Sequence, residues 1–179
     1  MKKLILIFLA GAIFASCNNA GKPATDSSKD SLASAAPAQV MNYPYTIEHP
    51  DNWDMGNKQN TMTMLTGLKA FENGNIAECM KSFGDSIHMR FEGLDKTVSN
   101  DSLMAMFTRN RAGIKSMSIK MEDWESVISK DKKTEYVTLW YTESVEDMSG
   151  KKDSMDVVND AKMKDGKCIE LSQYTRKIN

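Results

Sequence analysis

The sequence has no excess of basic charge, few cysteines and no residue spacing typical of a metal site, and each of these features excludes a class of function. The chain of 179 residues has a formal net charge of −1. A nucleic-acid-binding surface needs clustered basic residues, so nucleic acid is not an expected partner. There are three cysteines but no CxxC pair, and neither His49 nor His88 has a second histidine or cysteine three or four residues away. No metal site is implied.

Motifs for nucleophilic and nucleotide chemistry are missing as well. No serine lies in a Gly-x-Ser-x-Gly elbow, and no glycine-rich phosphate loop precedes a predicted helix. The sequence therefore supports neither a serine hydrolase of that type nor a nucleotide-dependent enzyme, and we expect no cofactor.

An apolar run at the N-terminus predicts export. Lys2 and Lys3 precede LILIFLAGAIF, and small residues then lead to Cys17. The run is too short to span a bilayer stably, and the pattern is that of a secretory signal. Because FASC resembles a bacterial lipobox, we predict a signal peptide over residues 1–17 and lipid attachment at Cys17. The alternative is that Cys17 is an ordinary residue of a signal peptide. The lipid would anchor the chain to a membrane of the cell envelope, inner or outer.

The region after Cys17 is polar and small-residue-rich. Residues 18–40 are dominated by Ala, Ser, Asn, Asp and Pro and contain no aromatic residue. Such a composition buries too little apolar surface to offset the entropy of ordering, which predicts a disordered tether. One folded domain over residues 41–179 is expected to follow, because domains of about 100–150 residues are common. Its first residues, 41–53, are predicted to lie over the domain as an extended clasp.

Capping residues and apolar spacing predict three helices. The first is expected to start after Pro50, with Asp51, Asn52 or Asp54 as N-cap, and to run to about residue 73. Asn75 is predicted to cap a second helix that continues to Phe83 and stops at Gly84. The third is expected over about residues 100–111, ended by Gly113.

Alternation of apolar and polar residues predicts the strands. Residues 86–92 and a short return strand around 97–98 precede the third helix. After it come four longer strands, expected at 114–129, 134–145, 154–164 and 168–178. Asp165 and Gly166 are predicted to form the last hairpin corner, because such a turn needs a positive φ.

The run FENGNIAECMKSFGDSIHMRF and the later MDVVNDAKMKDGKCIELSQY resemble the NTF2-like superfamily and, within it, the SnoaL-like group. The resemblance covers residues 51–178. It implies an α+β cone in which three N-terminal helices pack on a strongly curved, mostly antiparallel sheet around a deep pocket. It also implies frequent homodimerisation through the outer sheet face, for which Tyr174 is our candidate residue.

Isomerase-like members of that superfamily supply a template of one tyrosine and two aspartates for proton transfer. In this chain the matching positions hold Gly67, Phe91 and Asn159, so none keeps its chemistry. If the last match is shifted by one or two residues, Asp156 or Asp160 becomes a candidate for the third template position. Strand parity, however, places both aspartates on the face opposite Asn159. His88 is also expected to face away from the pocket.

Combined with the inward strand faces of that template, the same parity implies an apolar pocket with Asn159 and Gln173 as its neutral polar groups. The alternative is a filled core in which these two side chains bond to each other or to backbone. The candidate pocket residues are Met64, Leu68, Met89, Phe91, Asn159, Leu171 and Gln173.

The leading hypothesis is a lipid-anchored envelope protein whose non-catalytic NTF2-like domain binds a small apolar ligand or a protein partner. One alternative is a SnoaL-like enzyme of polyketide cyclase, isomerase or dehydratase type; another is a structural dimerisation module. An oxidising envelope permits a disulfide between Cys79 and Cys168, but the apolar helix face around Cys79 favours a buried free thiol.

Overall fold

The structure is a computed structural model that describes residues 42–49 and 52–178. The predicted signal peptide, Cys17 and the predicted tether lie outside the described residues. Residues 44–179 form a compact unit of their own. Within the described part of the chain, no helix has both the length and the apolar character needed to cross a membrane.

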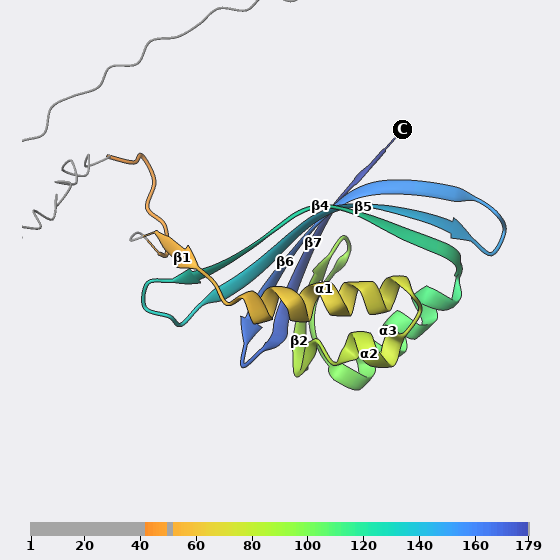
Figure 1. The fold of residues 1–179 in the computed structure, drawn as a ribbon, viewed down its shortest axis with the longest axis horizontal. Coiled ribbons are helices and arrows are strands. Elements are labelled where there is room, and N and C mark those ends of the chain that lie inside the picture. The colour runs from red at the N-terminus through yellow and green to blue at the C-terminus, as the bar shows by residue number, and fades with distance from the viewer. Residues whose placement is uncertain (1–41, 50–51, 179) are drawn as a thin grey trace, which may run out of the picture. The chain divides into compact units, whose positions relative to one another are not determined.

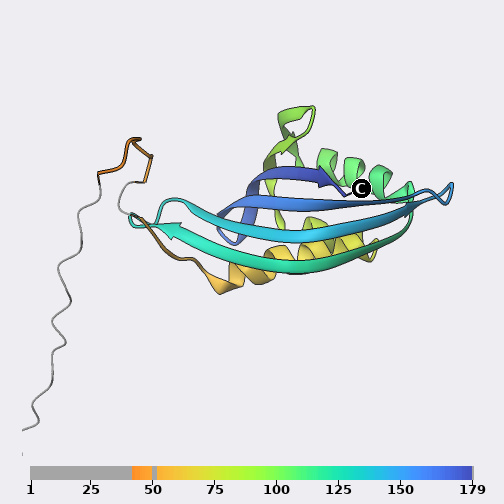
Figure 2. The same cartoon turned by 90° about the horizontal axis from the view of Figure 1, so that it is seen from above.

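The unit has an α+β fold in which the helices lie along one face of a single sheet (Figure 1). The sheet order is β1-β4-β5-β6-β7-β2-β3, and every neighbouring pair is antiparallel except β2 with β7. Seen from above, the long strands run side by side with the helices behind them (Figure 2). The elements are β1 Trp53–Met55, α1 Lys58–Glu72, α2 Ile76–Met80, β2 Phe83–Phe91, β3 Leu94–Ser99, α3 Asn100–Ala112, β4 Ile114–Ser129, β5 Glu135–Asp147, β6 Lys152–Lys164 and β7 Lys167–Lys177. The α+β prediction is confirmed, whereas strong curvature of the sheet stays a prediction.

The start of α1 differs from the sequence prediction. The N-cap is Asn57, whose side chain accepts a hydrogen bond from the Gln59 amide at 2.9 Å. The residues before it form β1 instead, in which Trp53 pairs with Ser129 at the end of β4. Trp53 also packs edge-on against Tyr136, with 5.9 Å between ring centroids. The preceding segment is not a clasp that buries its side chains, because Tyr45 and Ile47 are exposed.

The second helix is shorter than predicted. α2 ends at Met80, and from Phe83 the chain is already extended, so Gly84 lies inside β2 rather than stopping a helix. A contact distant in sequence explains this: the Cys168 amide donates to the Ser82 carbonyl at 2.8 Å. The end of the predicted helix therefore pairs with β7 and becomes part of the sheet.

The third helix occupies its predicted range and ends at the predicted C-cap. The Ser99 side chain accepts from the Ser102 amide, and Gly113 ends the helix. In its last turn, the Arg111 guanidinium donates to the carbonyl oxygens of Phe71 at 3.3 Å, Glu72 at 3.2 Å and Ile114 at 2.8 Å. Because unpaired carbonyls remain at a helix C-terminus, this contact satisfies the end of α1 and fixes it to α3.

The last four strands form the predicted meander. The corner between β6 and β7 has positive φ at Asp165 (50°) and Gly166 (75°), as the sequence predicts. Alternate residues of these strands point towards the helices and form the core with β2. The fully or nearly fully buried ones are Ile87, Met89, Val137, Leu139, Tyr141, Val157, Ala161, Met163 and Leu171.

Candidate functional site

A cavity of about 240 Å³ lies between the helices and the inner face of the sheet. Six of the seven candidate pocket residues line it: Met64, Leu68, Phe91, Asn159, Leu171 and Gln173. Met89 does not line it. This side chain has no exposed surface and belongs to the packed core, beside Ile87 on the same strand face.

Sequence reasoning missed the contribution of β5. Leu139, Tyr141 and Glu143 lie on alternate positions of this strand and all line the cavity. The alternation was visible in the sequence, but both strand faces carry aromatic residues, so periodicity could not choose the inner one. The aromatic wall formed by Phe71, Phe83 and Phe107 was missed as well.

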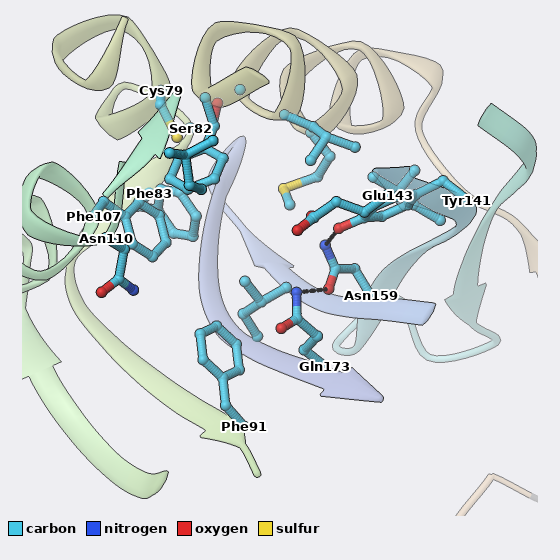
Figure 3. Close-up of a pocket in the computed structure, with 17 residues that line it drawn as sticks. Cys79, Ser82, Phe83, Phe91, Phe107, Asn110, Tyr141, Glu143, Asn159 and Gln173 are labelled. Atoms are coloured by element: carbon cyan, nitrogen blue, oxygen red, sulfur yellow. Dashed lines mark hydrogen bonds between the residues drawn. The ribbon is translucent and has the colours of Figure 1, made fainter. Parts of the chain in front are cut away.

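Three polar side chains form a directed chain of hydrogen bonds at the cavity (Figure 3). Gln173 Nε2 donates to Asn159 Oδ1 at 3.1 Å, and Asn159 Nδ2 donates to Tyr141 Oη at 3.0 Å. Strand pairing makes this possible. Asn159 on β6 lies directly opposite Gln173 on β7 and Leu139 on β5, and Leu139 precedes Tyr141 on the same face of β5. Since the phenol oxygen accepts from Asn159, the phenol hydrogen remains to be donated to another group.

Burial changes the pKa of Tyr141, whose phenol is part of this chain of hydrogen bonds. Tyr141 is 2% exposed, and desolvation raises its pKa well above the ordinary value. The phenol is therefore neutral at physiological pH. It supplies a hydrogen-bond donor rather than a negative charge.

Glu143 brings a carboxyl group into the cavity two residues after Tyr141. Figure 3 shows its side chain reaching from β5 into the space between the helices and the sheet. Burial raises the pKa of the Glu143 carboxyl. Among the described residues, no side chain forms a hydrogen bond or ion pair with it. In the described part of the chain, no Lys, Arg or His lines the cavity either.

The three template positions do meet at this cavity. Gly67, Phe91 and Asn159 all line it, although none carries a phenol or a carboxylate. The phenol and the carboxylate that the cavity contains come from β5, as Tyr141 and Glu143. Acid–base groups are thus present, on a strand that the family template does not use.

Three other candidate acid–base residues lie outside the cavity lining. Asp160 accepts a hydrogen bond from Thr138 Oγ1 at 2.8 Å, and Asp156 forms an ion pair with Arg176. His88 Nε2 lies 2.7 Å from Asp95 Oδ1 on the protein surface. All three lie on strand faces opposite the cavity-lining residues, and these polar contacts form there.

Both cysteines of the domain are free and buried. Desolvation raises the pKa of Cys79 and of Cys168 from 9.0 to about 12. Cys79 lines the cavity, but as a neutral thiol it is a poor nucleophile. Within residues 42–49 and 52–178, no group of three or more His, Cys, Asp and Glu side chains could hold a metal ion.

Comparison with known proteins identifies the fold. No family model and no curated protein matches the chain. Among solved structures, AusH from Aspergillus nidulans aligns with a TM-score of 0.55 at 15% identity, over 69% of this chain and 87% of AusH. An NTF2-like protein of unknown function from Burkholderia pseudomallei gives a TM-score of 0.54 at 14% identity, over 66% of this chain and 91% of the other. The domain has an NTF2-like fold.

One structural neighbour of the NTF2-like domain is an enzyme. An LEH-like epoxide hydrolase from M. tuberculosis aligns with a TM-score of 0.53 at 13% identity, over 66% of this chain and 84% of that chain. At such low identity the likeness shows the fold alone. Function must therefore be argued from the residues of the cavity.

Proposed function

We propose that this protein is a lipid-anchored cell-envelope protein whose NTF2-like domain binds a small, mostly apolar molecule in its cavity. The observation that supports this most is the cavity of about 240 Å³ itself, an apolar space with Tyr141, Asn159 and Gln173 among its lining residues. The bond between Gln173 and Asn159 is also expected in a filled core, so it does not distinguish the two alternatives. Small-molecule sites commonly combine apolar walls with a few fixed polar groups. A sheet that curves around the helices, as the family resemblance implies, would enclose such a molecule.

The chemistry of the cavity argues for binding rather than for a fully packed interior. Met64, Leu68 and Leu171 supply flexible or aliphatic contacts, and Phe91 adds an aromatic one. The phenol of Tyr141 adds a hydrogen-bonding group to this lining. An apolar molecule with one hydrogen-bonding group would complete both sets of contacts.

Native mass spectrometry of the chain beginning at Asn18, purified without detergent, tests the binding function. We expect a retained molecule that adds mass to the folded protein. Asn159→Leu and Phe91→Ala should each lower its occupancy severalfold, while Asp160→Asn on the outer face should leave it unchanged. Retention that is equal in all four proteins would place the molecule elsewhere and contradict the proposal. The same spectra report whether the domain is a homodimer, as we propose for the outer sheet face around Tyr174.

Membrane attachment through Cys17 has its own test. Cells that produce the full chain should incorporate labelled palmitate into it, and Cys17→Ser should abolish the label. A label that survives this substitution would show that Cys17 is not the attachment site. The predicted role of the tether, residues 18–40, is to hold the domain away from the lipid headgroups.

Glu143 favours a second candidate function, an enzyme that transfers a proton to or from a carbon atom of its substrate. A carboxyl with a raised pKa near a donating phenol is suited to acid–base catalysis. Glu143 would take a proton from a carbon atom next to a carbonyl group of the substrate, and the Tyr141 hydroxyl would donate a hydrogen bond to the oxygen of the enolate that forms. Incubation of the retained molecule with the protein in D2O should then add deuterium at carbon, and Glu143→Gln should prevent this. Absence of exchange at carbon would leave binding as the function.

A further inference from the structure

We infer that the molecule bound in the cavity carries a positively charged amine, which lies against Glu143. This inference rests on the proposed binding function and names the chemical class of the ligand. Neither the family resemblance nor the structural neighbours imply it. It follows from the charge, the walls and the hydrogen-bonding groups of the cavity.

The first argument is charge. Among the residues that the structure describes, Glu143 is the only acid that lines the cavity, and no basic side chain lines it. Among the described residues, no partner neutralises the Glu143 carboxyl from within the protein. An ionised carboxylate is unfavourable in apolar surroundings unless it is paired and hydrogen-bonded. A cationic ligand supplies that pairing, whereas an anionic ligand would be repelled by the same group.

The neighbours of Glu143 leave the carboxylate open to a ligand. Its cross-strand partners are Ile119 on β4 and Met155 on β6, which carry no charge. On its own strand the nearest titratable side chain on the inner face is Tyr141, which is neutral because its pKa is raised. The cavity is therefore the side from which a positive charge can approach.

The second argument is the aromatic wall. Phe107 packs edge-on against both Phe71 and Phe83, with ring centroids 5.2 Å and 5.8 Å apart. Figure 3 shows Phe83 and Phe107 on the opposite side of the cavity from Tyr141. Because Glu143 follows Tyr141 on β5, this wall lies across the cavity from the carboxylate and contacts the apolar body of the amine rather than its charge.

The third argument is the supply of acceptors. An ammonium group has only donors and needs acceptor oxygens around it. Glu143 offers two, and the side-chain carbonyl of Gln173 offers another, because Gln173 uses its amide nitrogen to bond Asn159. The cavity volume of about 240 Å³ is below the range of about 300–1,000 Å³ that is usual for ligand sites. The expected ligand is therefore a compact amine with an apolar body.

Three probes with one carbon skeleton separate charge from shape: 4-phenylbutylamine, 4-phenylbutan-1-ol and 4-phenylbutanoate. Their binding to the chain beginning at Asn18 is measured by calorimetry near neutral pH. We expect the amine to bind about tenfold more tightly than the alcohol, and the carboxylate to bind most weakly. In Glu143→Gln, the affinity for the amine should fall about tenfold, while the affinity for the alcohol stays within about threefold.

The matched control is Glu146→Gln. Glu146 lies on the same strand but pairs with Lys115 and does not line the cavity. This substitution should leave the affinities for all three probes unchanged. Thermal unfolding of each variant establishes that it is folded.

The possible failures are distinguishable. If the alcohol binds at least as tightly as the amine, or if Glu143→Gln does not weaken amine binding, the inference is wrong. The binding function would still stand if Asn159→Leu weakened binding of the alcohol. If none of the probes binds at millimolar concentration, the inference is wrong. The binding function fails too if native mass spectrometry also finds no retained molecule.

Discussion

Gly67 on α1 lies so close to Ser82 that the structure has no room for a side chain there. A Cβ atom added to Gly67 would stand 2.3 Å from Ser82 Oγ and 2.8 Å from Ser82 Cβ. Ser82 is held in place, because its hydroxyl donates to the Thr63 carbonyl at 2.9 Å. This position matches the tyrosine of the family template, so the close packing explains why a phenol cannot occupy it.

Gly67→Ala should therefore destabilise the domain, although Gly to Ala in an open helix stabilises by about 1 kcal/mol. Overpacking of this kind costs about 1–3 kcal/mol. The free energy of unfolding, measured by urea titration with circular dichroism, should fall by about that amount. In the background of Ser82→Gly, which removes the clashing atoms, the same substitution should cost less. An equal cost in both backgrounds would show that Ser82 is not the obstacle.

Asn159→Leu should lower stability as well as ligand binding. The substitution leaves the Gln173 amide without its acceptor and Tyr141 Oη without its donor. A buried polar group that loses its partner costs about 1–3 kcal/mol. Asp160→Asn, the neighbouring residue on the outer face, should change the unfolding free energy by less than about 0.5 kcal/mol. Equal effects of the two substitutions would contradict a structural role for the buried chain.

Glu143→Gln should stabilise the domain at neutral pH. Burial raises the pKa of this carboxyl above its ordinary value of 4.5. The folded protein therefore holds the proton more tightly than the unfolded chain does, and stability falls as pH rises from the unfolded pKa through the folded pKa. Glutamine is neutral throughout, so the gain should be full above the folded pKa, should shrink as pH falls from the folded pKa towards 4.5, and should be absent well below that value.

Urea titrations of both proteins across this pH range measure the effect. A gain that does not change with pH would mean that the Glu143 charge is not its cause. Glu146→Gln provides the comparison. This substitution removes an acid that is paired with Lys115, so it is not expected to stabilise the domain.

Arg111→Met should destabilise the domain by about 2–3 kcal/mol, because it removes a charged donor from three carbonyl groups at the junction of α1, α3 and β4. Methionine keeps much of the side-chain length. Arg109→Met, an exposed residue in the same helical turn, should change stability by less than about 0.5 kcal/mol. A similar loss in both variants would assign the effect to helix charge rather than to these bonds.

The two cysteines should be unreactive in the folded domain. Their burial and their pKa of about 12 keep the thiols neutral and inaccessible. In the chain beginning at Asn18, a thiol reagent at mildly alkaline pH should label neither residue until the protein is unfolded. After unfolding, two thiols should react, with or without prior reduction. A thiol that appears only after reduction would reveal a disulfide.

Local sequence patterns predicted most elements of the fold because their causes are local. Ser99 and Gly113 delimit α3 through bonds to residues a few positions away. The Asp165–Gly166 corner needs a positive φ that this pair tolerates. β4 occupies the predicted range, since sixteen residues leave ample room for an alternating pattern.

Interactions between distant residues decided the remaining elements. β1 has three residues, too few for a periodic signal, and it exists because Trp53 meets the end of β4. α2 stops early because the Ser82 carbonyl bonds with the Cys168 amide. Neither partner is near in sequence, so neither boundary could be predicted from local propensity.

The candidate site likewise has one part that the sequence predicted and one part that only the structure showed. Strand alternation in the sequence placed Asn159 and Gln173 on the same faces as apolar residues, and the family template indicated that these faces point inward. Only the tertiary structure decided that β5 places Tyr141 and Glu143 in the cavity. The reason is that an alternating pattern defines two faces of a strand, but packing against the neighbouring strands and helices selects which face is buried.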